Sequence, residues 1–130
     1  MKMELFARTL KQLPVFKYSF GHSGPSVLVI GGVHGDEPEG IIAAQGLLAA
    51  FNHYYTYNLQ VTVIPEFNPE GILSNRRTNS SGVDLNRNLP TKDWSPEFKT
   101  ERYYPGPRAA SELENQSLVQ IGRASCRERV

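Results

Sequence analysis

The sequence predicts an α/β protein built on a sheet with parallel strands. Residues 26–30 form a continuous apolar and β-branched run, which is typical of a strand buried on both faces. Apolar residues then recur at helical spacing from Glu39 to Phe51, and a second apolar run follows at 59–64. A strand, a helix and a strand in this order imply a right-handed crossover, so the two strands are expected to be parallel neighbours.

Other elements follow from local patterns. Residues 15–20 alternate between apolar and polar side chains, which predicts a half-exposed strand. The Asn-Pro and Gly at 67–71 predict a turn, and 74–90 is expected to be a loop around a short extended piece. An acidic first turn at 111–114 opens another helix. Residues 122–130 show no strand or helix pattern, and we expect them to be a non-native tail.

Composition excludes several classes of function. The 130 residues carry 14 Lys+Arg against 13 Asp+Glu, so the charge balance indicates neither nucleic acid nor an anionic membrane as partner. Charged side chains interrupt the first twenty residues, which therefore fit neither a secretory signal nor a membrane span. A cytoplasmic location is expected, and a single cysteine, Cys126, fits a reducing compartment. The oligomeric state is left open.

The chain is organised around GGVHGDEPEG at 31–40. This loop follows a strand and precedes a helix, so it lies at the carboxyl edge of the sheet, where open α/β sheets bind ligands. Pro38 suits the first helical turn, and Asp36 or Glu37 is expected to cap it. His34 and Glu37 offer an imidazole nitrogen and a carboxylate oxygen, two of the three protein ligands of a hydrolytic zinc site. The alternative is a loop histidine beside a helix-capping acid.

Three motifs together carry a family resemblance. HGDE, NPEG and RTNSSGVDLNRNLP occur in this order, and with them the sequence resembles the zinc carboxypeptidase family, and within it the bacterial murein peptide amidase branch. The resemblance covers about residues 26–118. It implies a three-layer α/β/α sandwich on a mixed, mainly parallel sheet, of which residues 1–121 are the N-terminal part.

The resemblance also implies roles for individual residues. His34 and Glu37 match the first two zinc ligands, and Asp84 matches the acid that hydrogen-bonds the ligand histidine. Asn86 and Arg87 match the pair that holds the terminal carboxylate of a substrate, a task suited to a planar guanidinium.

The oxyanion donor is the catalytic residue that the resemblance implies within this chain. Arg77, five positions before Gly82, matches the arginine that polarises the scissile carbonyl, and Arg76 is the alternative. The third zinc ligand, a later tyrosine and the general-base glutamate have no counterpart in the sequence. The chain is therefore expected to be an inactive fragment of an enzyme.

The expected activity of the complete enzyme is that of a zinc metallocarboxypeptidase. It would hydrolyse a peptide or amide bond next to a free C-terminal carboxylate, with murein peptides as the substrate that the branch implies. A zinc deacylase of the succinylglutamate desuccinylase and aspartoacylase type is the alternative, because it shares the histidine and glutamate pair. A non-catalytic fragment is the third possibility.

Overall fold

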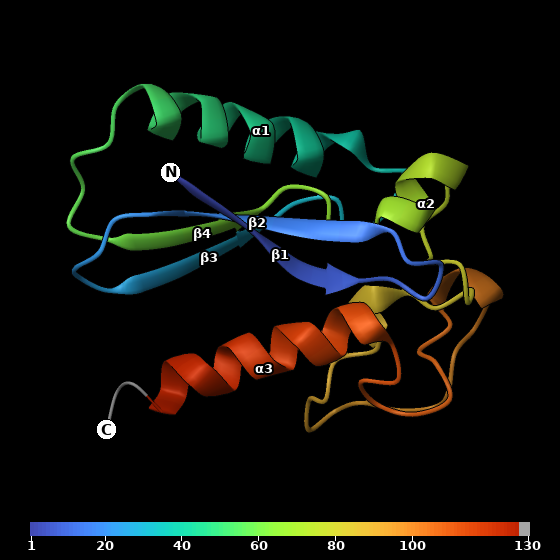
Figure 1. Cartoon of the computed structure of the whole chain (residues 1–130). Coiled ribbons are helices and arrows are strands. Elements are labelled where there is room, and N and C mark those ends of the chain that lie inside the picture. Colours follow the sequence, from blue (N-terminus) through green and yellow to red (C-terminus); the bar gives the residue numbers. More distant parts are fainter. Residues whose placement is uncertain (128–130) are drawn as a thin grey trace.

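The computed structural model describes residues 1–127, and the side-chain environments of residues 1–123. Two long helices lie on opposite faces of a four-stranded sheet (Figure 1). The helices are α1 (Pro38–His53) and α3 (Leu113–Arg127), with a short helix α2 (Pro69–Ser74) at one end of the sheet. The strands are β1 (Lys2–Arg8), β2 (Pro14–Phe20), β3 (Ser26–Ile30) and β4 (Gln60–Ile64).

The sheet is mixed, in the order β1-β2-β4-β3. β3 and β4 pair in parallel with Val27 opposite Val61, and α1 forms the crossover between them, which confirms the predicted strand-helix-strand unit. β2 pairs with β4 and with β1 in antiparallel orientation. Strand β1 was not expected from the sequence, because its three consecutive apolar residues break the alternation and none of its residues is β-branched.

Each face of the sheet has its own apolar core. Alternate residues of a strand point to opposite faces, so Val61 and Val63 of β4 pack toward α1 while Ile64 belongs to the other core. On the α1 side these valines join Phe20, Ala44 and the partly buried Leu47, Leu48 and Phe51. On the α3 side the core consists of Ala7, Val15, Ile64, Phe67 and Leu85, with Leu118 of α3 against it. These two layers of packing confirm the α/β/α arrangement.

Three local expectations were wrong. β3 is an edge strand of the described sheet and not buried on both faces, so Val27 and Leu28 each remain 39% exposed. The predicted turn after β4 is instead helix α2, because the buried side chain of Asn68 caps it by accepting the Gly71 N–H at 3.0 Å. The expected extended piece within 74–90 is a 3₁₀ turn at Leu85–Arg87.

Helix α3 extends past the predicted end of regular structure. The sequence places a boundary at 121/122, but α3 continues to Arg127. A formed helix gains one backbone hydrogen bond for each residue added, so weak helix formers such as Gly122 can extend it. The predicted tail therefore has helical structure over 122–127, and its last three residues lie outside the described part. Its foreign origin stays a prediction. No helix within residues 1–127 has the length and apolar character needed to cross a membrane.

Candidate metal centre and carboxylate pocket

The loop between β3 and α1 positions the predicted metal ligands. Gly32 adopts a positive φ of 65°, which lets the chain turn sharply after the strand. Gly35 lies directly against the backbone of Gly71 in α2, where any side chain would collide.

Of the two predicted caps, Asp36 and Glu37, Glu37 directly precedes α1, but its side chain forms no capping hydrogen bond, so this alternative is wrong. The Glu37 carboxylate points toward His34 instead. Oδ2 of Asp36 lies 3.1 Å from Nη1 of Arg102.

His34 is held between two carboxylates. Its Nδ1 lies 3.2 Å from Oε2 of Glu37, and its Nε2 lies 2.9 Å from Oδ1 of Asp84. Asp84 is fully buried, and because a carboxylate can only accept hydrogen bonds, Nε2 is the donor in this contact. Nδ1 faces Oε2 of Glu37, either with a proton that it donates or with a lone pair that a shared cation can accept.

This geometry fits part of a zinc site. Without metal, a ring protonated on both nitrogens donates to Glu37 as well as to Asp84; with metal, the lone pair of Nδ1 and the Glu37 carboxylate can bind the same cation. Two donors bound to one tetrahedral zinc ion at about 2.0–2.2 Å lie about 3.3–3.6 Å apart, and the 3.2 Å between Nδ1 of His34 and Oε2 of Glu37 is close to the lower end of this range. Asp84 approaches the opposite nitrogen and is no third ligand. In the described part of the chain no three His, Cys, Asp or Glu side chains gather to hold a metal, and His22 and His53 are exposed elsewhere.

Arg77 joins the two carboxylates that flank the histidine. Its Nε donates to Oδ2 of Asp84 at 2.9 Å, and its Nη1 lies 3.5 Å from Oε1 of Glu37. The Arg77 side chain is only 11% exposed. Asp84 thus pairs with His34 and Arg77 and also accepts the backbone N–H of Asn86 at 3.0 Å, which satisfies a carboxylate that would otherwise be costly to bury.

The structure distinguishes the two arginines that the sequence left as alternatives. Arg77 is directed into the His34 cluster, whereas Arg76 is exposed. The guanidinium of Arg77 is therefore the one that can reach a carbonyl bound next to His34.

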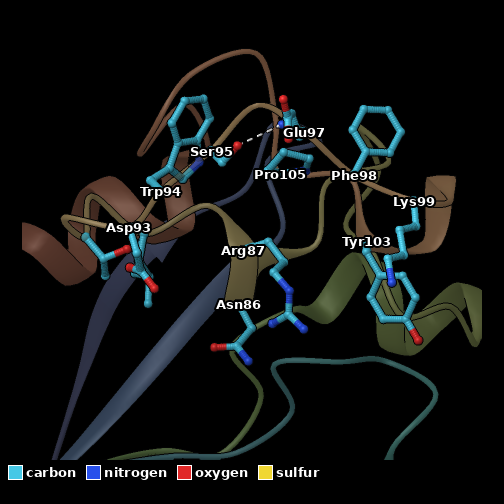
Figure 2. A pocket seen from close by; sticks show the side chains of 12 residues that line it. Asn86, Arg87, Asp93, Trp94, Ser95, Glu97, Phe98, Lys99, Tyr103 and Pro105 are labelled. Atoms are coloured by element: carbon cyan, nitrogen blue, oxygen red, sulfur yellow. Dashed lines mark hydrogen bonds between the residues drawn. The ribbon is translucent and has the colours of Figure 1, made fainter.

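Asn86 and Arg87 line a pocket of about 740 Å³. Both are exposed at the 3₁₀ turn that follows Asp84, so their side chains are free to meet a ligand. Figure 2 shows Asn86, Arg87 and Tyr103 pointing the same way, whereas Trp94 points to the other side of the pocket. The pocket thus presents one guanidinium and one amide side by side, a combination suited to a carboxylate.

Two residues that sequence reasoning missed connect the His34 loop, the Arg77 loop and the carboxylate pocket. Asn68 is buried, and its Nδ2 donates to the carbonyl oxygens of Val33 at 3.2 Å and Arg77 at 3.4 Å, which joins the histidine loop to the arginine loop. Tyr103 lies beneath the guanidinium groups of Arg77 and Arg87. The Asn-Pro pair at 68–69 was the only local signal, and it was interpreted as a turn.

Helix α3 supports the arginine loop through one buried asparagine. The Oδ1 of Asn79 accepts the N–H groups of Ser81 and Val83, each at 3.1 Å. Its Nδ2 donates to Oε1 of Glu112 at 2.8 Å and Oε2 of Glu114 at 3.1 Å. The loop that carries Arg77 and Asp84 is therefore anchored to the start of α3.

We expect Glu114 to make stability depend on pH. Burial raises its pKa from 4.5 to about 7, and the charges of Glu70 and Glu112 add to the effect. Between these pH values the folded chain keeps a proton that the unfolded chain has lost, so the free energy of unfolding falls as pH rises, by up to roughly 3 kcal/mol. Urea unfolding from pH 4 to 8 measures this. Glu114→Gln should remove most of the slope and Glu112→Gln should keep it; an unchanged slope in Glu114→Gln would contradict the assignment.

Comparisons with known proteins agree with this geometry. The profile of the succinylglutamate desuccinylase/aspartoacylase catalytic domain matches residues 23–122. Murein peptide amidase A of Escherichia coli K12 is 28% identical over 130 residues, which covers 91% of this chain and 52% of that protein. The chain therefore spans about half the length of this relative.

Solved structures share the fold. Bovine thrombin-activatable fibrinolysis inhibitor, in complex with tick carboxypeptidase inhibitor, superposes with a TM-score of 0.84 at 19% identity over 97% of this chain and 50% of that one. The murein-tripeptide amidase from Escherichia coli O157 superposes with a TM-score of 0.72 at 25% identity over 95% of this chain and 56% of that one.

Fold and neighbours define the class: the chain is the N-terminal part of a zinc-carboxypeptidase-like α/β fold, as the sequence motifs predicted. Within that class, it belongs to the succinylglutamate desuccinylase/aspartoacylase catalytic domain family. The resemblance to murein peptide amidase is confirmed as well. The desuccinylase and aspartoacylase of the family's name and the murein peptide amidases are hydrolases of amide bonds.

Proposed function

We propose that this chain forms the metal- and carboxylate-binding part of a zinc-dependent hydrolase, which cleaves an amide or peptide bond next to a carboxylate. The arrangement around His34 carries the proposal. Its Nδ1 faces the Glu37 carboxylate at 3.2 Å while the buried Asp84 holds Nε2 at 2.9 Å, an arrangement in which Nδ1 and the carboxylate can bind one cation together.

Each side chain has a distinct part in the proposed reaction. His34 and Glu37 would hold zinc, which when bound supplies a water of lowered pKa and polarises a carbonyl. Asp84 keeps the His34 ring in place and keeps the proton on Nε2. Arg77 donates hydrogen bonds to the carbonyl oxygen as negative charge develops on it. Asn86 and Arg87 bind the carboxylate and so orient the scissile bond.

The carboxypeptidase-type activity on murein peptides is the first candidate. It is supported by the identity to murein peptide amidase A over 91% of this chain. The pocket beside Arg87, of about 740 Å³, has room for a C-terminal residue with a long side chain. The substrate on this reading is a peptide with a free C-terminal carboxylate.

Deacylation of an acyl-amino acid is the second candidate. It is supported by the family profile over residues 23–122. Both candidates use the same metal pair and the same carboxylate grip, so the structure of this chain fits either substrate. The experiment is to assay a complete protein that contains this chain on murein tripeptides and on N-acetylaspartate and N-succinylglutamate. Turnover of the acyl-amino acids alone would refute the peptidase proposal.

We expect the 130-residue chain to bind zinc weakly and to lack peptidase turnover. Two protein ligands leave two coordination positions to water, whereas hydrolytic zinc sites have three protein ligands. Isothermal titration should give a binding curve that saturates only well above equimolar zinc, and Glu37→Gln should weaken it further. Tight binding of one zinc ion at His34 and Glu37, or turnover by the zinc-loaded chain, would contradict this expectation.

A further inference from the structure

Both proposed functional arginines lie over one aromatic ring. The Cζ atom of Arg77 is 5.0 Å from the centroid of the Tyr103 ring, and that of Arg87 is 5.8 Å from it. Guanidinium groups within about 6 Å of a ring centroid are attracted to the negative face of the ring. Because two cations brought close together repel each other, a shared ring stabilises an arrangement that would otherwise spread apart.

The ring of Tyr103 is fixed relative to both loops of the candidate site. It ends the 3₁₀ turn Glu101–Tyr103. On one side of it, Nη1 of Arg102 lies 3.1 Å from Oδ2 of Asp36, in the loop that carries His34. On the other side, the carbonyl oxygen of Tyr104 accepts the backbone N–H of Asp84 at 2.8 Å. These two tethers set the distance between the ring and the His34 cluster.

The two arginines depend on the ring to different degrees. Arg77 is also held by the carboxylates of Asp84 and Glu37. Arg87 is exposed, and within the described residues it forms no salt bridge, so Tyr103 is its main restraint. The charge of an arginine without an ion pair is not neutralised by a protein carboxylate and can attract a ligand. A ring face orients such an arginine and leaves its N–H groups free to donate to that ligand.

We infer that Tyr103 is a positioning residue of the carboxylate pocket, whose ring holds Arg87 at a fixed distance from Arg77. One substrate can then present its carboxylate to Arg87 and its scissile carbonyl to Arg77 at the same time. This inference rests on the proposed function, because it assumes that Arg87 binds a carboxylate. Without the ring, Arg87 samples more rotamers, and binding has to restrict them.

The test uses the full 130-residue chain without zinc and N-acetylalanine as the carboxylate probe, with binding followed by NMR titration. Tyr103→Leu should raise the Kd about 2- to 30-fold, the range expected for one or two cation–π contacts of about 0.5–1 kcal/mol each. Tyr103→Phe keeps the ring and should stay within about twofold of the parent chain. The amide of N-acetylalanine should bind equally weakly to every variant. Tyr54→Leu, at an exposed tyrosine on the far end of α1, is the matched control.

NMR relaxation of the Arg87 side chain distinguishes a role of Tyr103 in positioning Arg87 from a role in the stability of the fold. The Nε of Arg87 should become more mobile in Tyr103→Leu and keep its parent mobility in Tyr103→Phe. The double variant Arg87→Ala/Tyr103→Leu should have the same Kd as Arg87→Ala alone, because the ring acts through that arginine. If Tyr103→Leu does not fold, Tyr103→Met takes its place with the same expectations.

The outcomes distinguish the two proposals. If Arg87→Ala leaves N-acetylalanine binding unchanged, the carboxylate pocket fails and the proposed function with it. If Arg87→Ala abolishes binding but Tyr103→Leu binds like the parent chain, only the role of Tyr103 fails. If Tyr103→Phe weakens binding as much as Tyr103→Leu, the hydroxyl group and not the ring face is responsible, which also overturns the inference.

Discussion

Replacing His34 with alanine is expected to abolish zinc binding and activity together in the complete protein. The imidazole is one of the three protein ligands that a hydrolytic zinc site requires, and the two ligands left in the complete protein do not complete the site. Asp84 keeps its contact with Nε of Arg77 at 2.9 Å, so the loop should stay folded. Zinc content by atomic absorption and turnover measure the two effects, with circular dichroism to check the fold.

The matched controls for this substitution are His22→Ala and His53→Ala. Both histidines are exposed and distant from the His34 cluster, so neither change should lower zinc content or activity. If the His34→Ala protein retains one equivalent of zinc, the metal lies elsewhere and the assignment of His34 as a ligand is wrong.

Replacing Arg77 with alanine should lower kcat by about 10²–10³, or roughly 3–4 kcal/mol, with little change in KM. A donor to the carbonyl oxygen acts most strongly where charge develops in the transition state, so the loss appears in kcat. Steady-state kinetics of the complete protein measure it. Arg76→Ala is the matched control, because Arg76 is exposed and should leave kcat near that of the parent.

The contacts of Arg77 give a second possible origin for a lower kcat, namely weaker support of the zinc ligands. Measuring zinc affinity distinguishes this origin from loss of oxyanion stabilisation. Arg77 also braces Asp84 and Glu37, at 2.9 Å and 3.5 Å. If Arg77→Ala weakens zinc binding as much as it lowers kcat, the arginine supports the ligands and does not stabilise the oxyanion. If Arg76→Ala shows the kcat loss and Arg77→Ala does not, the assignment through this loop is wrong by one residue.

The parallel unit of the fold was predictable, and the rest of the sheet was not. The runs at 26–30 and 59–64 are rich in β-branched residues and flank a helical pattern, so local preference and final structure agree. β1 lacks that preference and is held by its pairing with β2. The exposure of β3 depends on which strands lie beside it, and a short apolar run does not specify its neighbours.

The candidate site was predictable where motifs carry it. His34, Glu37, Asp84 and Arg77 come together as the family resemblance implied, although Asp84 is fifty positions from His34 in sequence. The roles of Asn68 and Tyr103 arise from contacts across loops, which no local pattern reveals. Asp36 or Glu37 was expected to cap α1 because acids are common there, yet the carboxylate of Glu37 is directed to His34 and Arg77.

NMR of the histidine side-chain nitrogens tests most directly whether zinc binds to Nδ1 of His34. Long-range ¹H–¹⁵N spectra of the 130-residue chain, recorded during zinc titration, report on Nδ1 and Nε2 of each histidine separately. We expect Nδ1 of His34 to shift to a metal-bound value while Nε2 keeps its proton, because Asp84 accepts a hydrogen bond from it at 2.9 Å. Zinc bound through Nε2 of His34, or a response at His22 and His53 with His34 unchanged, would contradict it.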